Sequence, residues 1–390
     1  MRKLWITLPA LAPDYSGVCS AMFELGGLSV IHDASGCTGN YTGYDEPRWY
    51  GSKSAVFCSG LREIDAVLGR DDKLIDQIVK ACADLQPSMV TVLGSPVPML
   101  IGTDMDGIAC EVEERTGLPA FGFSTSGLAL YNQGVSQAIC ALIRRFCRRP
   151  EEKIPRGVNL LGMTPLDFST NSNAQDVVRL LEDHGFPVIG RLMMGVTLEQ
   201  IQRLGEAQVN RVVSEAGFAP AQLLWQRYGI PYVVGLPVGE GETVCRMLEE
   251  TLADGQCRIQ KDPAEQGDLL IVGEQVAANA LRHAIRLQDP QAKVVVGTMF
   301  GLRAELASEG DLDIPDEEAL RKQIHSHRFR RMIGDPLFEE LIGPADNLRF
   351  YPLPHVAVSS KVHWDVVPAW LGTPMQEMIQ TIVREQKECE

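Results

Sequence analysis

Short apolar runs alternate along this chain with segments whose apolar residues recur at helical spacing. The apolar runs predict β-strands at 88–94, 118–123, 157–162, 186–190, 268–273 and 293–297. Helical spacing predicts amphipathic helices at 107–116, 173–184 and 275–287. Continuous apolar strands that alternate with such helices indicate parallel sheets covered by helices on both faces.

Two polar, proline-bearing stretches, 148–151 and 261–263, interrupt this alternation. Linkers between domains have this composition, and a chain of 390 residues is long enough for two or three domains. We therefore predict an α/β protein with three doubly wound, Rossmann-like domains and mainly parallel sheets. The predicted domains are an N-terminal one at 1–150, a second at 151–262, and a third at 263–390 that ends in a helix. Ligands of such folds bind at the carboxyl ends of strands, here between the domains.

The composition of the chain limits which binding partners and which cellular location we expect. The net charge of −15 and the pI of about 5.0 disfavour nucleic acid and anionic membranes. No run of eighteen apolar residues predicts a membrane span. The apolar run near the start is short and broken by Pro9, so we interpret it as mature protein rather than a signal peptide. Ten cysteines in such a chain predict a reducing cytoplasm, with thiols or metal ligands rather than disulfides.

Three cysteines stand beside small residues near the start of the chain. Cys19, Cys37 and Cys58 have no C-x-x-C spacing, so the usual zinc and ferredoxin motifs are absent from the sequence. Thiolate is nevertheless a soft ligand suited to iron–sulfur clusters, and Gly36 and Gly39 would let the backbone approach a bulky group. The alternative for each cysteine is a small buried core thiol.

Residues around these cysteines belong to an ordered series of short motifs. The series contains Cys19, His32, Gly36, Cys37, Tyr41, Ser59, Glu63, Asp65, Val67, Gly69, Pro96, 101–104, 228–231, 363–365 and Gly372. In order and spacing it resembles the nitrogenase component 1 family over nearly the whole chain. That family also contains dark-operative protochlorophyllide reductase, nickel-sirohydrochlorin diamide reductive cyclase and cluster-assembly scaffolds.

The resemblance implies that Cys19 and Cys37 ligate an iron–sulfur cluster, 4Fe–4S or larger. Cys58 is a core thiol, a further ligand, or a ligand that replaces one lost elsewhere, and Ser95 stands where the family has its next cysteine. Two thiolates cannot complete a cubane, which normally takes four ligands. We therefore expect a cluster that bridges two subunits, in a homodimer or in a heterodimer or heterotetramer with a similar subunit.

Two further positions bear on the substrate. Ser214 and Leu371 align with the cysteine and histidine that hold the large cofactor of true nitrogenases. Leucine cannot ligate a metal, so we expect no dinitrogen reduction and instead a pocket for an organic or alternative ligand. His355 lies in 353–361, which we interpret as an apolar strand that ends in two serines and a lysine. This histidine is a candidate catalytic proton donor, and a hydrogen-bonded core histidine is the alternative.

The resemblance implies the catalytic-type subunit of a two-component, nitrogenase-like oxidoreductase. Such a subunit receives electrons from an ATP-dependent iron–sulfur protein and passes them through its cluster to a small-molecule substrate. The P-loop motif is absent from this sequence, so the ATPase has to be a separate protein. One alternative is a scaffold or carrier for metallocluster assembly without turnover. Another is a ligand-binding protein that has lost its cluster.

Overall fold

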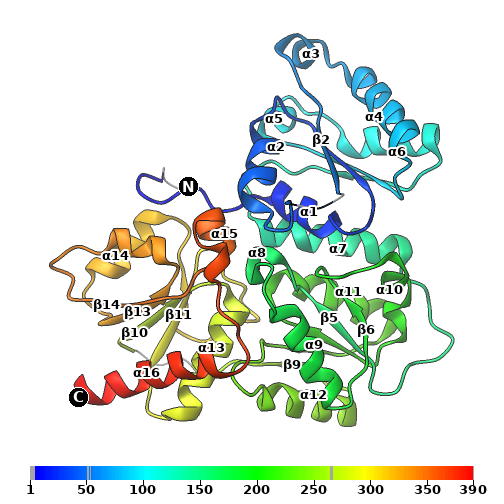
Figure 1. Cartoon of the computed structure of the whole chain (residues 1–390). Helices are drawn as coiled ribbons and strands as arrows, with labels where there is room; N and C mark the ends of the chain where they lie inside the picture. Colours follow the sequence, from blue (N-terminus) through cyan, green and yellow to red (C-terminus); the bar gives the residue numbers. More distant parts are fainter. Residues whose placement is uncertain (1–4, 51, 53, 264–266, 390) are drawn as a thin grey trace.

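The computed structural model describes residues 5–50, 52, 54–263 and 267–389, and its strands form three sheets that follow one another along the chain (Figure 1). The first sheet has the strand order β2-β1-β3-β4. Its strands are β1 (Leu28–Ile31), β2 (Ala55–Cys58), β3 (Val90–Leu93) and β4 (Ala120–Phe123).

The second and third sheets contain five strands each, in the orders β6-β5-β7-β8-β9 and β12-β11-β10-β13-β14. All the strand pairs in the three sheets are parallel, which confirms the predicted α/β class. The strands are β5 (Val158–Leu161), β6 (Val188–Arg191), β7 (Val209–Val212), β8 (Tyr232–Val234), β9 (Arg258–Ile259), β10 (Leu269–Val272), β11 (Val294–Thr298), β12 (Leu312–Asp313), β13 (Arg331–Gly334) and β14 (Arg349–Pro352).

Helices cover the faces of these sheets, as the alternating pattern predicts. The α-helices are α1 (Asp14–Met22), α2 (Gly36–Asn40), α3 (Glu63–Leu68), α4 (Asp71–Leu85), α5 (Pro96–Leu100), α6 (Met105–Thr116), α7 (Tyr131–Phe146), α8 (Pro165–Phe168), α9 (Asn173–Asp183), α10 (Leu198–Arg203), α11 (Phe218–Tyr228), α12 (Glu242–Asp254), α13 (Gln275–Gln288), α14 (Glu317–His325), α15 (Val356–Ser359) and α16 (Thr373–Cys389). Short helical segments of other types are η1 (Tyr41–Asp45), η2 (Leu204–Glu206), η3 (Glu215–Gly217), η4 (Pro336–Leu341), η5 (Ser360–Val362) and η6 (Trp364–Val366).

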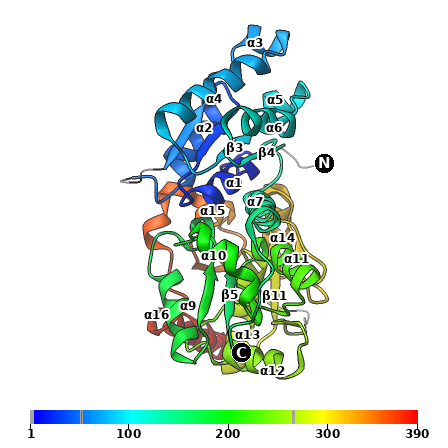
Figure 2. The same ribbon diagram turned by 90° about the vertical axis from the view of Figure 1, so that its right-hand side faces the viewer.

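Helix α7 lies between the first sheet and the elements of the second sheet (Figures 1 and 2). It packs against α1 on one side and against α10 and α11 on the other. Two glycines allow the backbones of α1 and α7 to touch. A Cβ atom at Gly17 would lie 2.1 Å from the carbonyl oxygen of Tyr131, and one at Gly134 would lie 1.9 Å from that of Asp14. Any larger residue at either position would force these two helices apart.

The segment 353–361 differs from the prediction, because it forms α15 and η5 instead of a strand. The carboxylate of Asp335 is the physical reason. It accepts hydrogen bonds from the backbone N–H of His355 at 2.8 Å and from the hydroxyl of Ser359 at 2.7 Å. These two hydrogen bonds stabilise a single helical turn directly after β14. The pattern of apolar residues in the sequence does not predict them.

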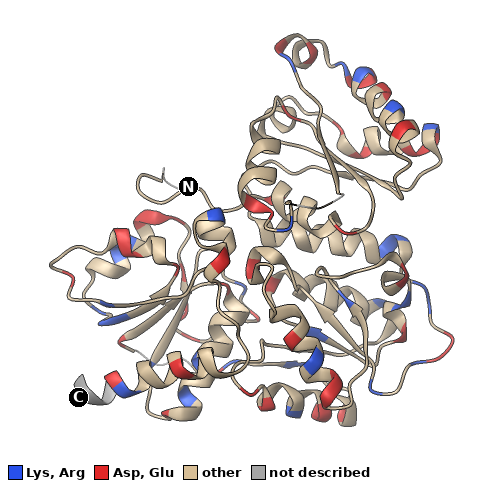
Figure 3. Cartoon of the chain, viewed as in Figure 1, with Lys and Arg blue, Asp and Glu red and all other residues tan. Residues whose placement is uncertain are grey.

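Charged residues gather on outward-facing helices such as α4 and α12, while the central strands are buried (Figure 3). No described helix is both long enough and apolar enough to cross a membrane. Several large apolar side chains of the first hundred and thirty residues are nevertheless exposed, among them Leu100 and Leu128. Exposed apolar side chains that gather in one region mark candidate contact surfaces for other proteins.

Candidate functional site

The loop after β1 organises the cysteine region through His32 and Asp33. The carboxylate of Asp33 accepts a hydrogen bond from the backbone N–H of Cys37 at 2.8 Å. The backbone carbonyl of Asp33 accepts a hydrogen bond from the thiol of Cys58 at 3.2 Å. The His32 ring lies 2.9 Å from the hydroxyl of Ser59, which follows β2. The loop therefore holds both cysteines at the carboxyl ends of β1 and β2, the sheet edge at which ligands bind in parallel folds.

Cys37 is half-buried on the short helix α2, beside two hydroxyl groups. Burial raises the pKa of its thiol, and hydrogen bonds with Tyr15 and Ser95 partly offset this effect. Ser95 follows β3 and donates its own hydroxyl to the carbonyl of His32 at 2.8 Å. The position at which the family has a further cysteine is thus next to Cys37, but here it offers a serine hydroxyl.

Cys19 lies on α1, one helical turn after Tyr15, and is only 1% exposed. Residues four apart share one side of a helix, so Cys19 and the Tyr15 ring that contacts Cys37 are on the same side of α1. Burial, together with the charge of Glu46, strongly raises the pKa of the Cys19 thiol. The Glu46 carboxylate is itself held by Arg48, with Nε to Oε1 at 2.7 Å.

These donors fit part of an iron–sulfur site and not a whole one. Among the described residues, no group of three or more His, Cys, Asp or Glu side chains is arranged to hold a metal ion. The Cys19 thiol is on α1 and the Cys37 thiol is on α2, and a cubane takes four ligands. The space in front of α2 is open, because a Cβ atom at Gly36 or Gly39 would meet nothing within 4 Å. The arrangement therefore fits a cluster only if a second subunit supplies further ligands.

Cys58 lies on the edge strand β2 and borders a different space. Together with Phe57 and residues of α4 it lines a cavity of about 400 Å³ between β2 and α4. Its thiol also accepts the backbone N–H of Gly60 at 3.4 Å. Both roles considered for this cysteine, ligand and structural thiol, are compatible with these contacts.

A second group of polar side chains lies where strands of the second and third sheets end. Asp167 follows β5, Glu215 follows β7, Glu274 follows β10 and His355 follows β14, while Tyr131 begins α7. We call these five residues the junction group. His355 is the one member that sequence reasoning selected.

His355 and Tyr131 meet at one carboxylate oxygen. The Nε2 atom of His355 lies 3.2 Å from Oδ1 of Asp167, and the hydroxyl of Tyr131 donates to the same oxygen. The imidazole also packs on the ring of Phe300, with centroids 5.0 Å apart. Burial and the charge of Asp167 raise the pKa of Tyr131 well above its usual value, so this hydroxyl remains a proton donor.

Two buried atoms of this group have no hydrogen-bond partner among the described residues. They are Oδ2 of Asp167 and Nδ1 of His355. A buried polar atom without a partner is costly, and such atoms in folded proteins usually face a ligand or ordered water. The pair therefore has hydrogen-bonding capacity that no described residue uses.

The remaining carboxylates of the junction group are held by backbone and arginine. Glu274 accepts the backbone N–H groups of Glu215 and Ala277, each at 2.8 Å, and so caps the start of α13. Burial and the charge of Asp167 raise the pKa of Glu274 to about 8. Glu215 is paired with Arg303, whose Nε lies 2.7 Å from Oε1. The group can thus hold a proton near neutral pH.

Helices α1 and α7 connect the cysteine region to the junction group. Gly17 stands between Tyr15 and Cys19 in the sequence, and it packs directly on the backbone of Tyr131. Tyr131 in turn bonds Asp167. Two helices in backbone contact therefore join the two candidate sites without an intervening flexible segment.

The pocket expected between Ser214 and Leu371 is closed at Ser214. Ser214 is 1% exposed, and its hydroxyl donates to the carbonyl of Gly162 at 2.6 Å. Leu371 pairs with Gly239 through a β-bridge and lies within 3.4 Å of a Cβ atom built on Gly241. The polar atoms without partners lie instead on Asp167 and His355.

Sequence reasoning missed four members of the junction group. Three of them lie within a few residues of the end of a predicted or observed strand, namely Asp167, Glu215 and Glu274. That position could have marked them as candidate site residues, because ligands bind at the carboxyl ends of strands. Tyr131 gave no such signal, because it belongs to a helix of the first 150 residues and reaches Asp167 only through the packing of α7.

The family model for the nitrogenase component 1 type oxidoreductases matches residues 14–254. The chain belongs to this family. Its relatives include the nitrogenase iron-molybdenum cofactor biosynthesis protein NifE of Rhodobacter capsulatus, 25% identical over 69% of this chain and 57% of that protein. They also include one of the subunits of the light-independent protochlorophyllide reductase of Leptolyngbya boryana, 25% identical over 50% of this chain and 41% of that protein.

The nitrogenase molybdenum-iron protein alpha chain of Clostridium pasteurianum is 26% identical over 46% of this chain and 33% of its own length. The matched stretches thus span between 33% and 57% of these three relatives. A solved structure, "Nitrogenase Cp1 at pH 6.5", superposes with a TM-score of 0.72 over 100% of this chain and 95% of that chain, at 14% identity. This likeness confirms the nitrogenase-like α/β fold.

Proposed function

We propose that this chain is a catalytic-type subunit of a nitrogenase-like reductase, and that its small-molecule substrate is reduced beside His355 and Asp167. The observation that carries the proposal is the pair of unpartnered buried atoms, Asp167 Oδ2 and His355 Nδ1. A reduction that consumes protons needs donors in contact with the substrate. Imidazole is suited to this role near neutral pH, and Tyr131 and Asp167 fix its ring.

The chain's own residues would hold and move protons as follows. His355 presents Nδ1 toward the bound molecule while its Nε2 faces Asp167. Glu274 retains a proton up to about pH 8, and the charge of Asp167 is one cause of that shift. Phe300 covers one face of the imidazole and keeps water from it. After His355 gives up a proton, protonated Glu274 would supply its replacement.

We further propose that Cys19 and Cys37 hold an iron–sulfur cluster shared with a second subunit, either a copy of this chain or a similar one. Such a cluster supplies one-electron transfer when bound. Electrons would come from a separate P-loop iron–sulfur ATPase, because this sequence has no P-loop motif. Ser214 and Leu371 lack the ligand types of a nitrogenase cofactor site, so we exclude dinitrogen from the proposed substrates.

The experiment is anaerobic purification followed by iron and sulfide counts and EPR spectroscopy. The purified chain is then mixed with a P-loop iron–sulfur ATPase from the same organism and with MgATP. We expect an iron–sulfur EPR signal that changes when the ATPase delivers electrons. We also expect His355→Asn to slow electron consumption by about 10²-fold, the usual contribution of a general acid, at unchanged iron content. Equal rates for His355→Asn and the unaltered chain would contradict the assigned role.

A cluster scaffold is the second candidate function, because relatives named as cofactor biosynthesis proteins match the largest share of this chain among those compared. A scaffold would give up its iron to an acceptor protein and would not consume electrons continuously. The two functions are separated by following ⁵⁵Fe in the chain while electrons are supplied. Iron that stays bound through many electron transfers supports the reductase, and iron that leaves with the first acceptor supports the scaffold.

A further inference from the structure

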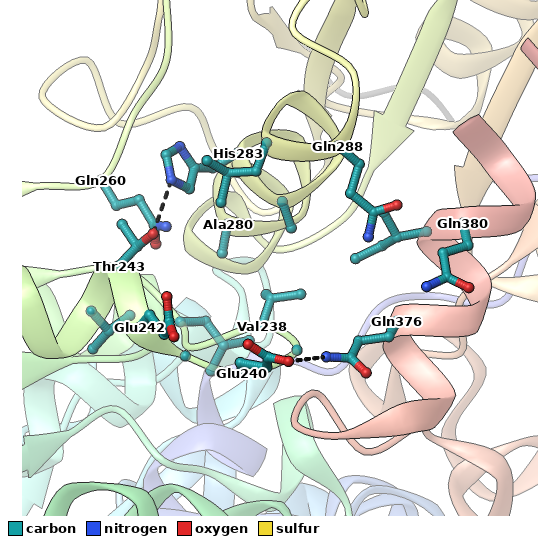
Figure 4. Close-up of a pocket in the computed structure, with 17 residues that line it drawn as sticks. Val238, Glu240, Glu242, Thr243, Gln260, Ala280, His283, Gln288, Gln376 and Gln380 are labelled. Carbon is teal, nitrogen blue, oxygen red and sulfur yellow. Dashed lines mark hydrogen bonds between the residues drawn. The ribbon is translucent and has the colours of Figure 1, made fainter. Parts of the chain in front are cut away.

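Two regions join the elements of the third sheet to the rest of the chain in different ways. One region borders a cavity of about 420 Å³ that parts of α12, α13 and α16 line (Figure 4). There the contacts are between side chains, with His283 Nε2 at 3.3 Å from Thr243 Oγ1 and Gln376 Nε2 at 3.4 Å from Glu240 Oε1. The other region is the segment 5–13, which runs from α14 past α15 to α1 (Figure 1). We call this segment the strap.

A single carboxylate on α14 anchors the first part of the strap. Oε2 of Glu317 accepts hydrogen bonds from three consecutive N–H groups, those of residues 6–8, at 2.9–3.0 Å. Oε1 of Glu317 accepts from the guanidinium of Arg321, which also donates to the hydroxyl of Thr7. Despite burial, these hydrogen bonds lower the pKa of Glu317 to about 2. The anchor is therefore charged at neutral pH, and hydrogen bonds to a charged acceptor are roughly twice as strong as those to a neutral one.

The last part of the strap lies between α15 and α7. The N–H of Ala12 donates to the carbonyl of Ala357 on α15 at 2.9 Å, and the carbonyl of Ala12 accepts from the N–H of Tyr131 on α7 at 3.0 Å. His355 directly precedes α15. The main chain of the strap thus connects the same two elements whose side chains, those of His355 and Tyr131, meet at Asp167.

The contacts at the two ends of the strap are linked through a short buried stretch. Residues 5–12 form no helix or strand, so their conformation depends on contacts with other elements. Leu8 and Leu11 are 5% and 6% exposed and belong to the main hydrophobic core. Three residues separate Leu8 from Ala12, and one of them is Pro9, whose ring fixes φ. A displacement at Leu8 is therefore transmitted to Ala12.

We propose that Glu317 is a positioning residue of the junction group, and that it acts through the strap on the turn that carries His355. The inference rests on the proposed function, in which His355 is the proton donor. With the strap anchored, Ala12 holds α15 and α7 in the relative position at which His355 Nε2 lies 3.2 Å from Asp167 Oδ1. With the strap released, α15 keeps its hydrogen bond to Asp335 and loses its connection to α7.

The first test needs no turnover and uses the full chain labelled with ¹⁵N, including its histidine rings. In Glu317→Ala we expect the amides of residues 6–8 to exchange with solvent about tenfold or more faster, because they lose a charged acceptor. We also expect the ring ¹⁵N signals of His355, assigned from their absence in His355→Asn, to shift as the contact with Asp167 is lost. The signals of His283 on α13 should not move. A loss of stability alone leaves the ring contacts of the folded state unchanged, so unshifted His355 signals would overturn the proposal.

Two further variants guard against misfolding and unrelated effects. Glu317→Gln keeps an acceptor without the charge, and it should change exchange and the His355 signals in the same direction by a smaller amount. Glu309→Ala removes an exposed glutamate between β11 and β12 and should change neither. If Glu317→Ala does not fold, Glu317→Gln decides, and unchanged exchange or unchanged His355 signals in it would overturn the proposal.

Electron consumption with the separate ATPase tests the consequence for the reaction. Glu317→Ala should slow it at unchanged iron content, and should have no further effect in the His355→Asn background, because both changes remove the same proton donation. Additive losses in the double variant would overturn the positioning role. If His355→Asn alone has no effect, the proposed function fails, while the ring signals of His355 still decide whether Glu317 positions that side chain.

Discussion

His355 and Asp167 are 188 residues apart in the chain, and their side chains meet with Nε2 and Oδ1 separated by 3.2 Å. Asp167 comes from the end of the second sheet's first strand, and His355 follows the last strand of the third sheet. Tyr131 adds a third segment to the same carboxylate oxygen. One carboxylate oxygen therefore joins three parts of the chain.

Replacing Asp167 tests how much its contacts with Tyr131 and His355 contribute to the free energy of unfolding. Asp167→Ala leaves the Tyr131 hydroxyl and His355 Nε2 buried without their acceptor, and a loss of about 1–3 kcal/mol is expected for each unsatisfied group. Urea unfolding followed by circular dichroism measures the change. Asp183→Ala, at an exposed position near the end of α9, is the matched control and should stay within about 0.5 kcal/mol. Equal unfolding midpoints for the two variants would contradict the prediction.

The raised pKa of Glu274 predicts how the free energy of unfolding depends on pH. Its pKa is about 8 in the folded chain and its ordinary value is 4.5, so between these values the folded state binds more protons than the unfolded state. Stability from this group is therefore fully present below about pH 4.5 and is lost as the pH rises through about 8. The loss reflects a buried carboxylate that gains charge away from water and near the charge of Asp167.

Glu274→Gln removes that titration and retains one acceptor oxygen at the start of α13. We expect the variant to lose less stability than the unaltered chain between pH 5 and pH 8, when unfolding free energies are measured at both values. Glu249→Gln, an exposed glutamate on α12, should leave the pH dependence unchanged apart from its surface pairing with Arg156. A steeper decline in Glu274→Gln would refute the predicted direction.

The sequence was sufficient for six of the strands, namely β3, β4, β5, β6, β10 and β11, and insufficient for the other strands and for the junction group. Buried parallel strands such as β5 and β10 have no polar face, so their apolar runs are visible without any tertiary information. The turn after β14 was wrong in the prediction because Asp335 determines it from twenty residues away. The contact between Tyr131 and Asp167 depends on how α7 packs, which no local pattern encodes.

The cysteine assignment predicts where iron is lost. Cys19→Ala and Cys37→Ala should each remove most of the bound iron while the far-ultraviolet circular dichroism stays unchanged, since each removes one of the few soft ligands. Cys110→Ala, at an exposed position on α6, should keep its iron and serves as the control. Iron and sulfide counts after anaerobic purification provide the measurement. Full iron content in Cys37→Ala would eliminate the assignment, and the count for Cys58→Ala separates its two possible roles.

The final prediction concerns the association of two subunits, because one chain offers too few thiols for a cluster. Leu100 and Leu128 are 85% and 80% exposed, and both flank the cysteine region. Leu100 ends α5, which begins directly after Ser95, and Leu128 follows Gly127, at which a Cβ atom would lie 3.3 Å from the Tyr15 ring. If a second subunit completes the cluster, it has to cover this surface, and burying both leucines would help to hold it there.

The double variant Leu100→Glu/Leu128→Glu should therefore be monomeric and should lose most of its iron, because charges in an apolar interface weaken association and a shared site then lacks half its ligands. Val67→Glu is the control, since Val67 is 75% exposed on α3, which lies at the far end of the first sheet's elements (Figure 1). It should leave mass and iron content unchanged. Anaerobic light scattering combined with iron analysis measures both quantities on one sample. A monomeric unaltered chain with a complete cluster would show that the ligands come from this chain alone, and a double variant that remains a fully loaded dimer would place the interface elsewhere.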